Sequence, residues 1–174
     1  MAYDVTMALI NTITQAAIKA MTPAINQLKA LGITHNLHEY VHDASAASYG
    51  LEAAEKLGVA TARVFKTLVV DAGNNTLAVA VLPVDKQLNL KCMAKAISAK
   101  KVTMANPAAV SRSSGYILGG VSPVGQKRLL ITVIDKSALA HGSIFVSGGQ
   151  RGLEIELAAS DLANVTKATF GVIT

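Results

Sequence analysis

The sequence predicts one α/β or α+β domain built around a mixed β-sheet, and three observations point to this fold class. The chain has 174 residues, which is the length of a single domain. Hydrophobic residues make up 51% of it, enough to build a core, and this excludes a disordered chain. Short apolar strands occur in pairs and alternate with helices that carry recognisable caps. The single cysteine, Cys92, excludes an intrachain disulfide framework.

The elements of the first half follow from caps, turns and alternation. Thr22 and Pro23 are typical of a helix start and Gly32 of a helix end. Gly58 closes a second helical pattern in the same way. We therefore expect a helix over 23–31, a strand over 33–41, a helix over 48–57, and a hairpin of strands 63–71 and 77–84 joined by a turn at 73–75.

The second half continues the alternation. A helix is predicted over 88–98, with Leu90, Ala94 and Ile97 facing the core. Ser160 and Asp161 are expected to cap a last helix that ends near Val165. The other expected elements are strands at 101–104, 129–134, 143–147, 153–157 and 168–173, a helical turn at 106–112, and a glycine-rich loop after that turn.

No segment resembles a membrane span, because the apolar runs are far shorter than the ~18 residues that a spanning helix needs. Residues 1–20 are apolar, but Asp4, Asn11 and Gln15 interrupt them, which does not fit a secretory signal. We expect an amphipathic or frayed helix there, or an added leader before a second start at Met21.

The positive charge is concentrated in the middle of the chain. The sequence holds 16 Lys and Arg against 11 Asp and Glu, but the segment from Lys86 to Arg128 contains no acidic residue. Such a block is typical of a surface that faces phosphate. A solvated helix face with a few strand-end lysines would give the same pattern.

Side chains that commonly carry catalysis give weak signals. Cys92 lies on a predicted helix without a neighbouring histidine, which favours a small buried thiol over a nucleophile. His38 and His42 share a strand face but lie roughly 13 Å apart by strand rise. That separation is too large for one ion without a bend, so we expect no metal site. No P-loop, dinucleotide fingerprint or nucleophile elbow occurs.

The remaining candidates for a functional site are two glycine-rich loops, 114–125 and 147–152, and one lysine. Glycines let main-chain N–H groups approach a phosphate or an oxyanion, although tight turns at strand ends explain them equally well. Lys66 opens an otherwise apolar strand. It is either an exposed strand-end lysine or a cleft lysine that stabilises negative charge.

At these motifs the sequence resembles the YbaK family of aminoacyl-tRNA deacylases, relatives of the editing domain of prolyl-tRNA synthetase. The resemblance covers residues 21 to about 170, and 1–20 lie outside it as an N-terminal extension to an editing domain at 21–174. It rests on motifs in the same order: MTPAINQLKALGI, HEYVHD, GLEAAEKLGV, VFKTLVV, LNLK, SSGY, GGVSPVGQKR and FVSGGQRGLEIELAASDLA.

The resemblance implies a compact domain with a mixed, barrel-like sheet flanked by helices. It also implies an enzyme that clears Cys-tRNA(Pro) in trans without a cofactor, the substrate thiol attacking its own ester. The expected catalytic groups are Lys66 and the amides of Gly119 and Gly120. The expected substrate-binding residues are Tyr40, Ser122, Pro123, Ser147 and Gly148. The lysines of the basic block expected to bind tRNA are Lys91, Lys95, Lys100 and Lys101.

The expected partners are the acceptor end of aminoacyl-tRNA and prolyl-tRNA synthetase, in the cytoplasm. Two alternatives stay open. The first is a deacylase for Ala-tRNA or the ester of another small amino acid. The second is a catalytically silent module that binds tRNA or the synthetase.

Overall fold

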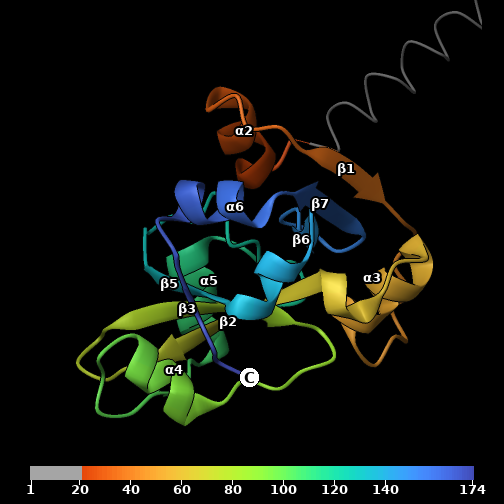
Figure 1. Cartoon of the computed structure of the whole chain (residues 1–174). Coiled ribbons are helices and arrows are strands. Elements are labelled where there is room, and N and C mark those ends of the chain that lie inside the picture. The colour runs from red at the N-terminus through yellow and green to blue at the C-terminus, as the bar shows by residue number, and fades with distance from the viewer. Residues whose placement is uncertain (1–20) are drawn as a thin grey trace, which may run out of the picture.

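The computed structural model describes residues 21–174, and within this range eight strands form one mixed sheet (Figure 1). The strands are β1 (Asn36–Glu39), β2 (Val64–Asp71), β3 (Leu77–Pro83), β4 (Thr103–Met104), β5 (Ile131–Asp135), β6 (Ile144–Ser147), β7 (Leu153–Leu157) and β8 (Thr169–Gly171). Their order is β1-β7-β6-β2-β3-β5-β8, and β4 pairs with β2 off this path. The expected extension, residues 1–20, lies outside the described residues.

The helices begin and end largely where the caps predict. They are α2 (Pro23–Ala30), α3 (Tyr49–Leu57), α4 (Leu90–Ala96), α5 (Pro107–Ser114) and α6 (Ala159–Thr166), with short 3-10 turns at Thr61–Arg63 and Lys136–Ala140. The Thr22 hydroxyl accepts the Ile25 N–H at the start of α2. Gly58 ends α3 in the left-handed conformation that glycine adopts at no steric cost. Among residues 21–174 we find no helix with the length and hydrophobicity that a membrane span requires.

The sheet combines a local hairpin with long-range parallel pairs. β2 and β3 are antiparallel over seven residue pairs, from Phe65 opposite Pro83 to Asp71 opposite Leu77, which confirms the predicted hairpin. β2 with β6, β3 with β5, and β5 with β8 are parallel. The predicted mixed sheet flanked by helices is therefore confirmed.

The two faces of the sheet are covered by different helices. Val79 and Val81 of β3 face a core that includes side chains of α2 and α6. Ala78, Ala80 and Leu82 alternate with them and pack against α4. Figure 1 shows α2 and α6 on one side of the sheet and α4 on the other.

Two local predictions are wrong. Leu90 is 37% exposed rather than buried, because it is the first residue of α4, directly after the Asn89 cap, whereas Ala94 is buried and Ile97 packs against the core as predicted. α6 begins after Ala158 without a side-chain cap, so Ser160 lies inside the first turn rather than before it.

Candidate functional site

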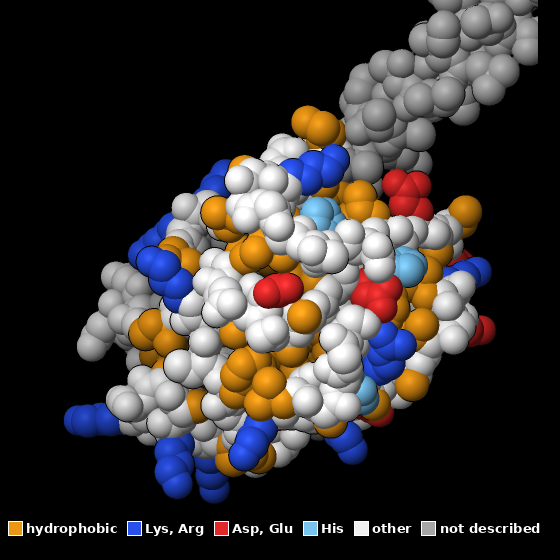
Figure 2. Space-filling model, turned by 45° about the horizontal axis from the view of Figure 1, so that its top comes forward, with side chains coloured by type: hydrophobic (Ala, Val, Ile, Leu, Met, Phe, Trp, Pro, Cys, Tyr) orange, Lys and Arg blue, Asp and Glu red, His pale blue; other side chains and the backbone are white. Residues whose placement is uncertain are grey.

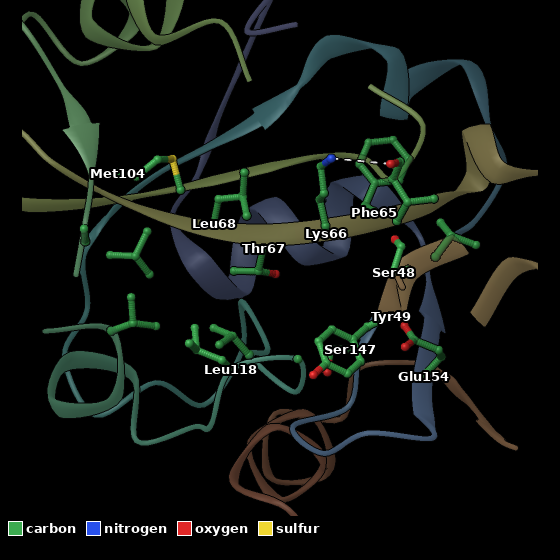
Figure 3. Close-up of a pocket in the computed structure, with 18 of the residues that line it drawn as sticks. Ser48, Tyr49, Phe65, Lys66, Thr67, Leu68, Met104, Leu118, Ser147 and Glu154 are labelled. Carbon is green, nitrogen blue, oxygen red and sulfur yellow. Dashed lines mark hydrogen bonds between the residues drawn. The ribbon is translucent and has the colours of Figure 1, made fainter. Parts of the chain in front are cut away.

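One edge of β2 is only partly paired, and this leaves room for a cavity. β6 pairs with Val64 and Phe65, and β4 pairs with Val70 and Asp71. No strand of residues 21–174 pairs with the stretch between them on that edge. A cavity of about 320 Å³ lies at this gap (Figure 3).

The gap opens where β6 turns away from β2. The last pair of this ladder joins Phe65 to Val146, and Ser147 then leads into the turn 148–152 toward β7. Ser147 is also the register partner of Glu154 on β7. Both residues therefore line the cavity at the point where the strands diverge.

The remaining walls come from the start of α3, the loop after α5 and apolar side chains of several elements. The start of α3 contributes Ser48, Tyr49 and Gly50. The loop after α5 contributes Leu118 and Gly119. Apolar side chains complete the lining and include Val64, Phe65, Leu68, Val69, Val84, Met104, Val110 and Val121. A concave, mostly apolar site with a few polar groups is typical of small-ligand binding.

Lys66 lies at the rim of the cavity. Its ammonium donates hydrogen bonds to the carbonyls of Val84, at 3.4 Å, and Lys86, at 2.5 Å. Desolvation by burial lowers the pKa of Lys66, and the nearby Asp85 carboxylate partly opposes that shift. The two carbonyls hold the charged group in place at the start of the open stretch.

Thr67 points to the other side of β2 and carries an unpaired hydroxyl. Figure 3 shows its side chain on the side of Ser147, Tyr49 and Leu118. Its Oγ1 is buried and has no hydrogen-bond partner, and no other side-chain atom of the described range shares this state. Because a buried hydroxyl without a partner is costly, it marks a place where a ligand would supply the missing bond.

Glu154 is a titratable residue of the cavity that the sequence did not single out. Its side chain lines the cavity, and the residue is 8% exposed. Desolvation by burial raises its pKa to about 8, so the carboxyl is mostly protonated at neutral pH. In the sequence, Leu153, Ile155 and Leu157 predict a buried face, which leaves the glutamates of this strand on the face expected to be solvated.

The first glycine-rich loop, 114–125, which we call the glycine loop, approaches α3 very closely at Gly119. The residue has a φ of +86°, and a Cβ there would lie 2.8 Å from two ring carbons of Tyr49 and 2.9 Å from Nε of Arg151. Both the conformation and the contact require glycine. The amide of Gly120, by contrast, donates to the Ile117 carbonyl at 3.0 Å and is already used within the loop.

Four residues expected to bind substrate do not line the cavity. Tyr40 is half-buried, and burial, followed by the charges of Glu154 and Glu52, raises its pKa to about 12. The buried hydroxyl of Ser122 accepts the Val124 N–H at 3.2 Å. The other two residues, Pro123 and Gly148, also lie outside the lining of this cavity.

Pro123 and Gly148 support neighbouring loops. Pro123 is buried and borders a separate cavity of about 230 Å³ near α2. The Gly148 N–H donates to the Leu153 carbonyl at 2.8 Å, and its own carbonyl accepts the Thr22 hydroxyl. Ser147 alone of the second glycine-rich loop lines the main cavity, where its Oγ accepts the Gly149 N–H at 3.3 Å.

The four lysines expected to bind tRNA are all exposed. Lys91 and Lys95 lie on α4, and Lys100 and Lys101 lie in the segment before β4. That segment leads to Met104, which lines the cavity. In Figure 2, Lys and Arg side chains project around the margin of the face in view, with hydrophobic side chains between them.

His38 and His42 each have a carboxylate partner and do not contact one another. His38 Nε2 lies 2.9 Å from Glu156 Oε2, and His42 Nδ1 lies 2.8 Å from Glu52 Oε2. The part of the chain from residue 21 onward contains no cluster of three or more His, Cys, Asp or Glu that could hold a metal ion. Cys92, on α4, is partly buried and does not line the cavity.

Comparisons with known proteins match the part of the chain that carries this site. A family model described as the aminoacyl-tRNA editing domain matches residues 42–165. A protein of Enterococcus faecalis, provisionally named Cys-tRNA(Pro)/Cys-tRNA(Cys) deacylase EbsC, is 40% identical over 121 residues. That match covers 70% of this chain and 74% of the relative.

Two solved structures share the fold. The hypothetical protein APE2540 is 28% identical with a TM-score of 0.77, over 87% of this chain and 99% of that one. A protein provisionally described as a trans-editing enzyme for prolyl-tRNA synthetase is 21% identical with a TM-score of 0.76, over 88% and 98%. The chain, as its motifs predict, belongs to the aminoacyl-tRNA editing domain family.

Proposed function

We propose that this protein is an aminoacyl-tRNA deacylase that acts in trans on Cys-tRNA(Pro). The observation that carries the proposal is the cavity at the open edge of β2, which is lined by the unpaired Thr67 hydroxyl, the desolvated Glu154 carboxyl and, at its rim, Lys66. The name of the Enterococcus faecalis relative supports cysteine as the amino acid.

Lys66 is suited to hold the 3′ end of the tRNA. An ammonium group has three N–H donors, and two of them are used by the carbonyls of Val84 and Lys86. The third is left for a phosphate near the terminal adenosine. The exposed lysines of α4 and of the segment before β4 would bind phosphates further along the acceptor stem.

The aminoacyl group is proposed to enter the cavity on the Thr67 side of β2. Its α-amino group or carbonyl oxygen would satisfy the Thr67 hydroxyl, and the Gly119 main chain would face the reacting carbonyl. Such fixed polar groups in an apolar cavity stabilise charge that develops in the transition state. The role of the Gly120 amide is reduced in this proposal, because that N–H is bonded to Ile117.

In the proposed reaction the sulfur of the bound cysteinyl group attacks its own carbonyl carbon and gives up its proton. The bond between that carbon and the ribose oxygen breaks, and the ribose oxygen takes a proton. The products are free tRNA and a cyclic thioester, which water opens to cysteine. Glu154 is proposed to carry the proton from sulfur to ribose, since a pKa near 8 lets it exchange protons near neutral pH.

The proposal extends to the setting of the reaction. We expect aminoacyl-tRNA as the direct partner and prolyl-tRNA synthetase as the source of the mischarged substrate, both in the cytoplasm. Residues 21–174 are proposed to act as one editing domain, with 1–20 as an extension to it.

The proposal is tested by hydrolysis of tRNA(Pro) carrying cysteine, α-aminobutyrate, alanine or serine. α-Aminobutyrate has the size of cysteine with a methyl group in place of the thiol. Loss of the cysteine ester alone supports the thiol-assisted route. Equal loss of the α-aminobutyrate and alanine esters would instead identify a deacylase for small amino acids.

Two further results separate the remaining alternatives. Salt-dependent tRNA binding without turnover of any ester would identify a binding module. Cys92→Ala should leave deacylation unchanged because Cys92 does not line the cavity. A large loss in that variant would indicate that the protein's own thiol takes part.

A further inference from the structure

Arg151 contacts two residues that belong to different walls of the cavity. It lies in the turn between β6 and β7, and its guanidinium carbon is 4.8 Å from the centroid of the Tyr49 ring. The same guanidinium donates two hydrogen bonds to the Leu118 carbonyl, at 2.9 and 3.3 Å. Because Tyr49 belongs to the α3 wall and Leu118 to the glycine loop, one side chain links both walls.

The loop fits against this pair without spare room. A Cβ on Gly119 would lie within 3 Å of both the Tyr49 ring and Arg151 Nε. The contact prevents the loop from moving toward α3, and the bonds to the Leu118 carbonyl oppose movement away from it. The position of Gly119 beside the open edge of β2 is therefore set by Tyr49 and Arg151 together.

Tyr49 also contacts a residue of the segment that precedes α3. The His42 ring lies 5.4 Å from the Tyr49 ring, and His42 Nδ1 is 2.8 Å from a Glu52 carboxylate oxygen. Glu52 is buried and also accepts the Asp43 N–H at 2.6 Å. Burial opposes the charged form of Glu52, but the bonds from Asp43 and His42 hold its pKa below the ordinary value.

The link lies at the surface rather than in the core. Arg151 is exposed, Leu118 is 47% exposed and Tyr49 is 40% exposed. A cation–π contact and hydrogen bonds in such surroundings add little to global stability. Their structural effect is confined to the spacing of the two walls.

We propose that Arg151 is a positioning residue of this site, which fixes the segment Leu118–Gly119 against Tyr49 and so sets the width of the cavity. Its kinetic consequence rests on the proposed deacylase function. A wall displaced by about 1 Å costs up to a hundredfold in rate, because the reacting groups lose their alignment.

The test compares Arg151→Lys and Arg151→Ala with the wild type. Lysine keeps the positive charge but loses the planar group that stacks on Tyr49 and donates two bonds to the one Leu118 carbonyl. We expect kcat/KM to fall on the order of tenfold or more in both variants, mainly through kcat, with an unchanged Tm. Arg112→Lys is the matched control, since Arg112 is an exposed arginine of α5 that does not line the cavity.

A second measurement does not depend on catalysis. Amide hydrogen exchange of residues 117–120, which include the Gly120 N–H bonded to Ile117, should become faster in both Arg151 variants. Exchange of β3 in the core should stay as in the wild type. If the wild type hydrolyses no ester, the proposed function fails, and this measurement still decides the positioning role.

Two results would overturn the inference. Unchanged exchange at 117–120 in Arg151→Lys would show that the link does not hold the loop. Loss of activity in Arg151→Ala with full recovery in Arg151→Lys would show that Arg151 acts only as a charge toward tRNA. Under the inference, Tyr49→Leu combined with Arg151→Ala should cost no more than the worse single variant, since both remove the same link.

Discussion

Lys66 and Thr67 are consecutive residues of β2, yet their side chains leave the strand on opposite sides (Figure 3). Lys66 lies opposite Leu82, which packs toward α4, and Thr67 lies opposite Val81, which faces the core with α2 and α6. One dipeptide therefore serves both the rim and the interior of the cavity, where the phosphate and the aminoacyl group are proposed to bind.

The Lys66→Ala variant should lose deacylation while it keeps the fold. We expect a fall in kcat/KM on the order of a hundredfold, because the ammonium proposed to hold the 3′-terminal phosphate, and so to align the ester in the cavity, is removed. Circular dichroism and Tm should change little, since the ammonium bonds only to loop carbonyls at the rim. The control is Lys56→Ala on the exposed side of α3. Full activity in Lys66→Ala would refute the assignment.

Thr67→Val should separate stability from activity. The substitution keeps the shape of the side chain and removes a buried hydroxyl that has no partner, so the free energy of unfolding should rise by about 1 kcal/mol. kcat/KM should fall roughly tenfold if that hydroxyl binds substrate. The Thr132 hydroxyl donates to the Leu130 carbonyl, so Thr132→Val should destabilise the protein and leave kcat/KM unchanged. Unchanged activity in Thr67→Val would remove Thr67 from the site.

Glu154→Gln should remove a pH dependence of stability. The folded pKa of about 8 lies above the ordinary value of 4.5, so the folded state keeps a proton that the unfolded state releases between those values. The contribution of Glu154 to the free energy of unfolding of the wild type is greatest below pH 4.5. It declines as the pH rises toward 8, by at most about 1.4 kcal/mol per pH unit. In urea unfolding, the free energy of unfolding of Glu154→Gln should therefore rise relative to that of the wild type between pH 5 and pH 8.

The same variant also tests the proposed proton transfer. Glutamine cannot carry a proton from sulfur to ribose, so kcat for the cysteine ester should fall by about a hundredfold or more. A stability difference that is constant with pH would contradict the desolvated state of Glu154. Unchanged kcat would contradict its role in the reaction.

Neutralising the basic block should weaken tRNA binding in a salt-dependent way. The variant replaces by glutamine the four exposed lysines expected to bind tRNA: Lys91, Lys95, Lys100 and Lys101. Each lost phosphate contact should make the plot of log K against log salt less steep by about 0.7–0.9. The control removes the same charge at four other exposed lysines: Lys29, Lys56, Lys136 and Lys167. Equal effects of the two sets would make the block ordinary surface.

Much of the fold is local in origin and could be predicted. Thr22 and Gly58 bond within or next to their own helices, and the β2–β3 hairpin is closed by the turn at 73–75. The strand 153–157 has the predicted bounds. Such features depend on neighbours along the chain, so propensity and capping are enough to place them.

The site depends on contacts that are distant in the sequence. Glu154 reads as one solvated residue of an alternating strand, and only the segments packed over that face of β7 make it a desolvated acid. The open edge of β2 arises because β6, about eighty residues later in the chain, pairs with Val64 and Phe65 and then turns away. The packing of Gly119 against Tyr49 and Arg151 has the same long-range origin.

The segments that surround the gap beside β2 lie far apart in the sequence, so they are expected to come together at different times during folding. The β2–β3 hairpin joins residues close in sequence and can form early. The part of the cavity wall formed by Ser147 and Glu154 can form only after β6 and β7 have paired. During synthesis Lys66 and Thr67 would leave the ribosome long before the strand pair that completes their surroundings. A nascent chain that ends before residue 154 would hold the rim of the site without its acid, so editing activity begins only with a nearly finished fold.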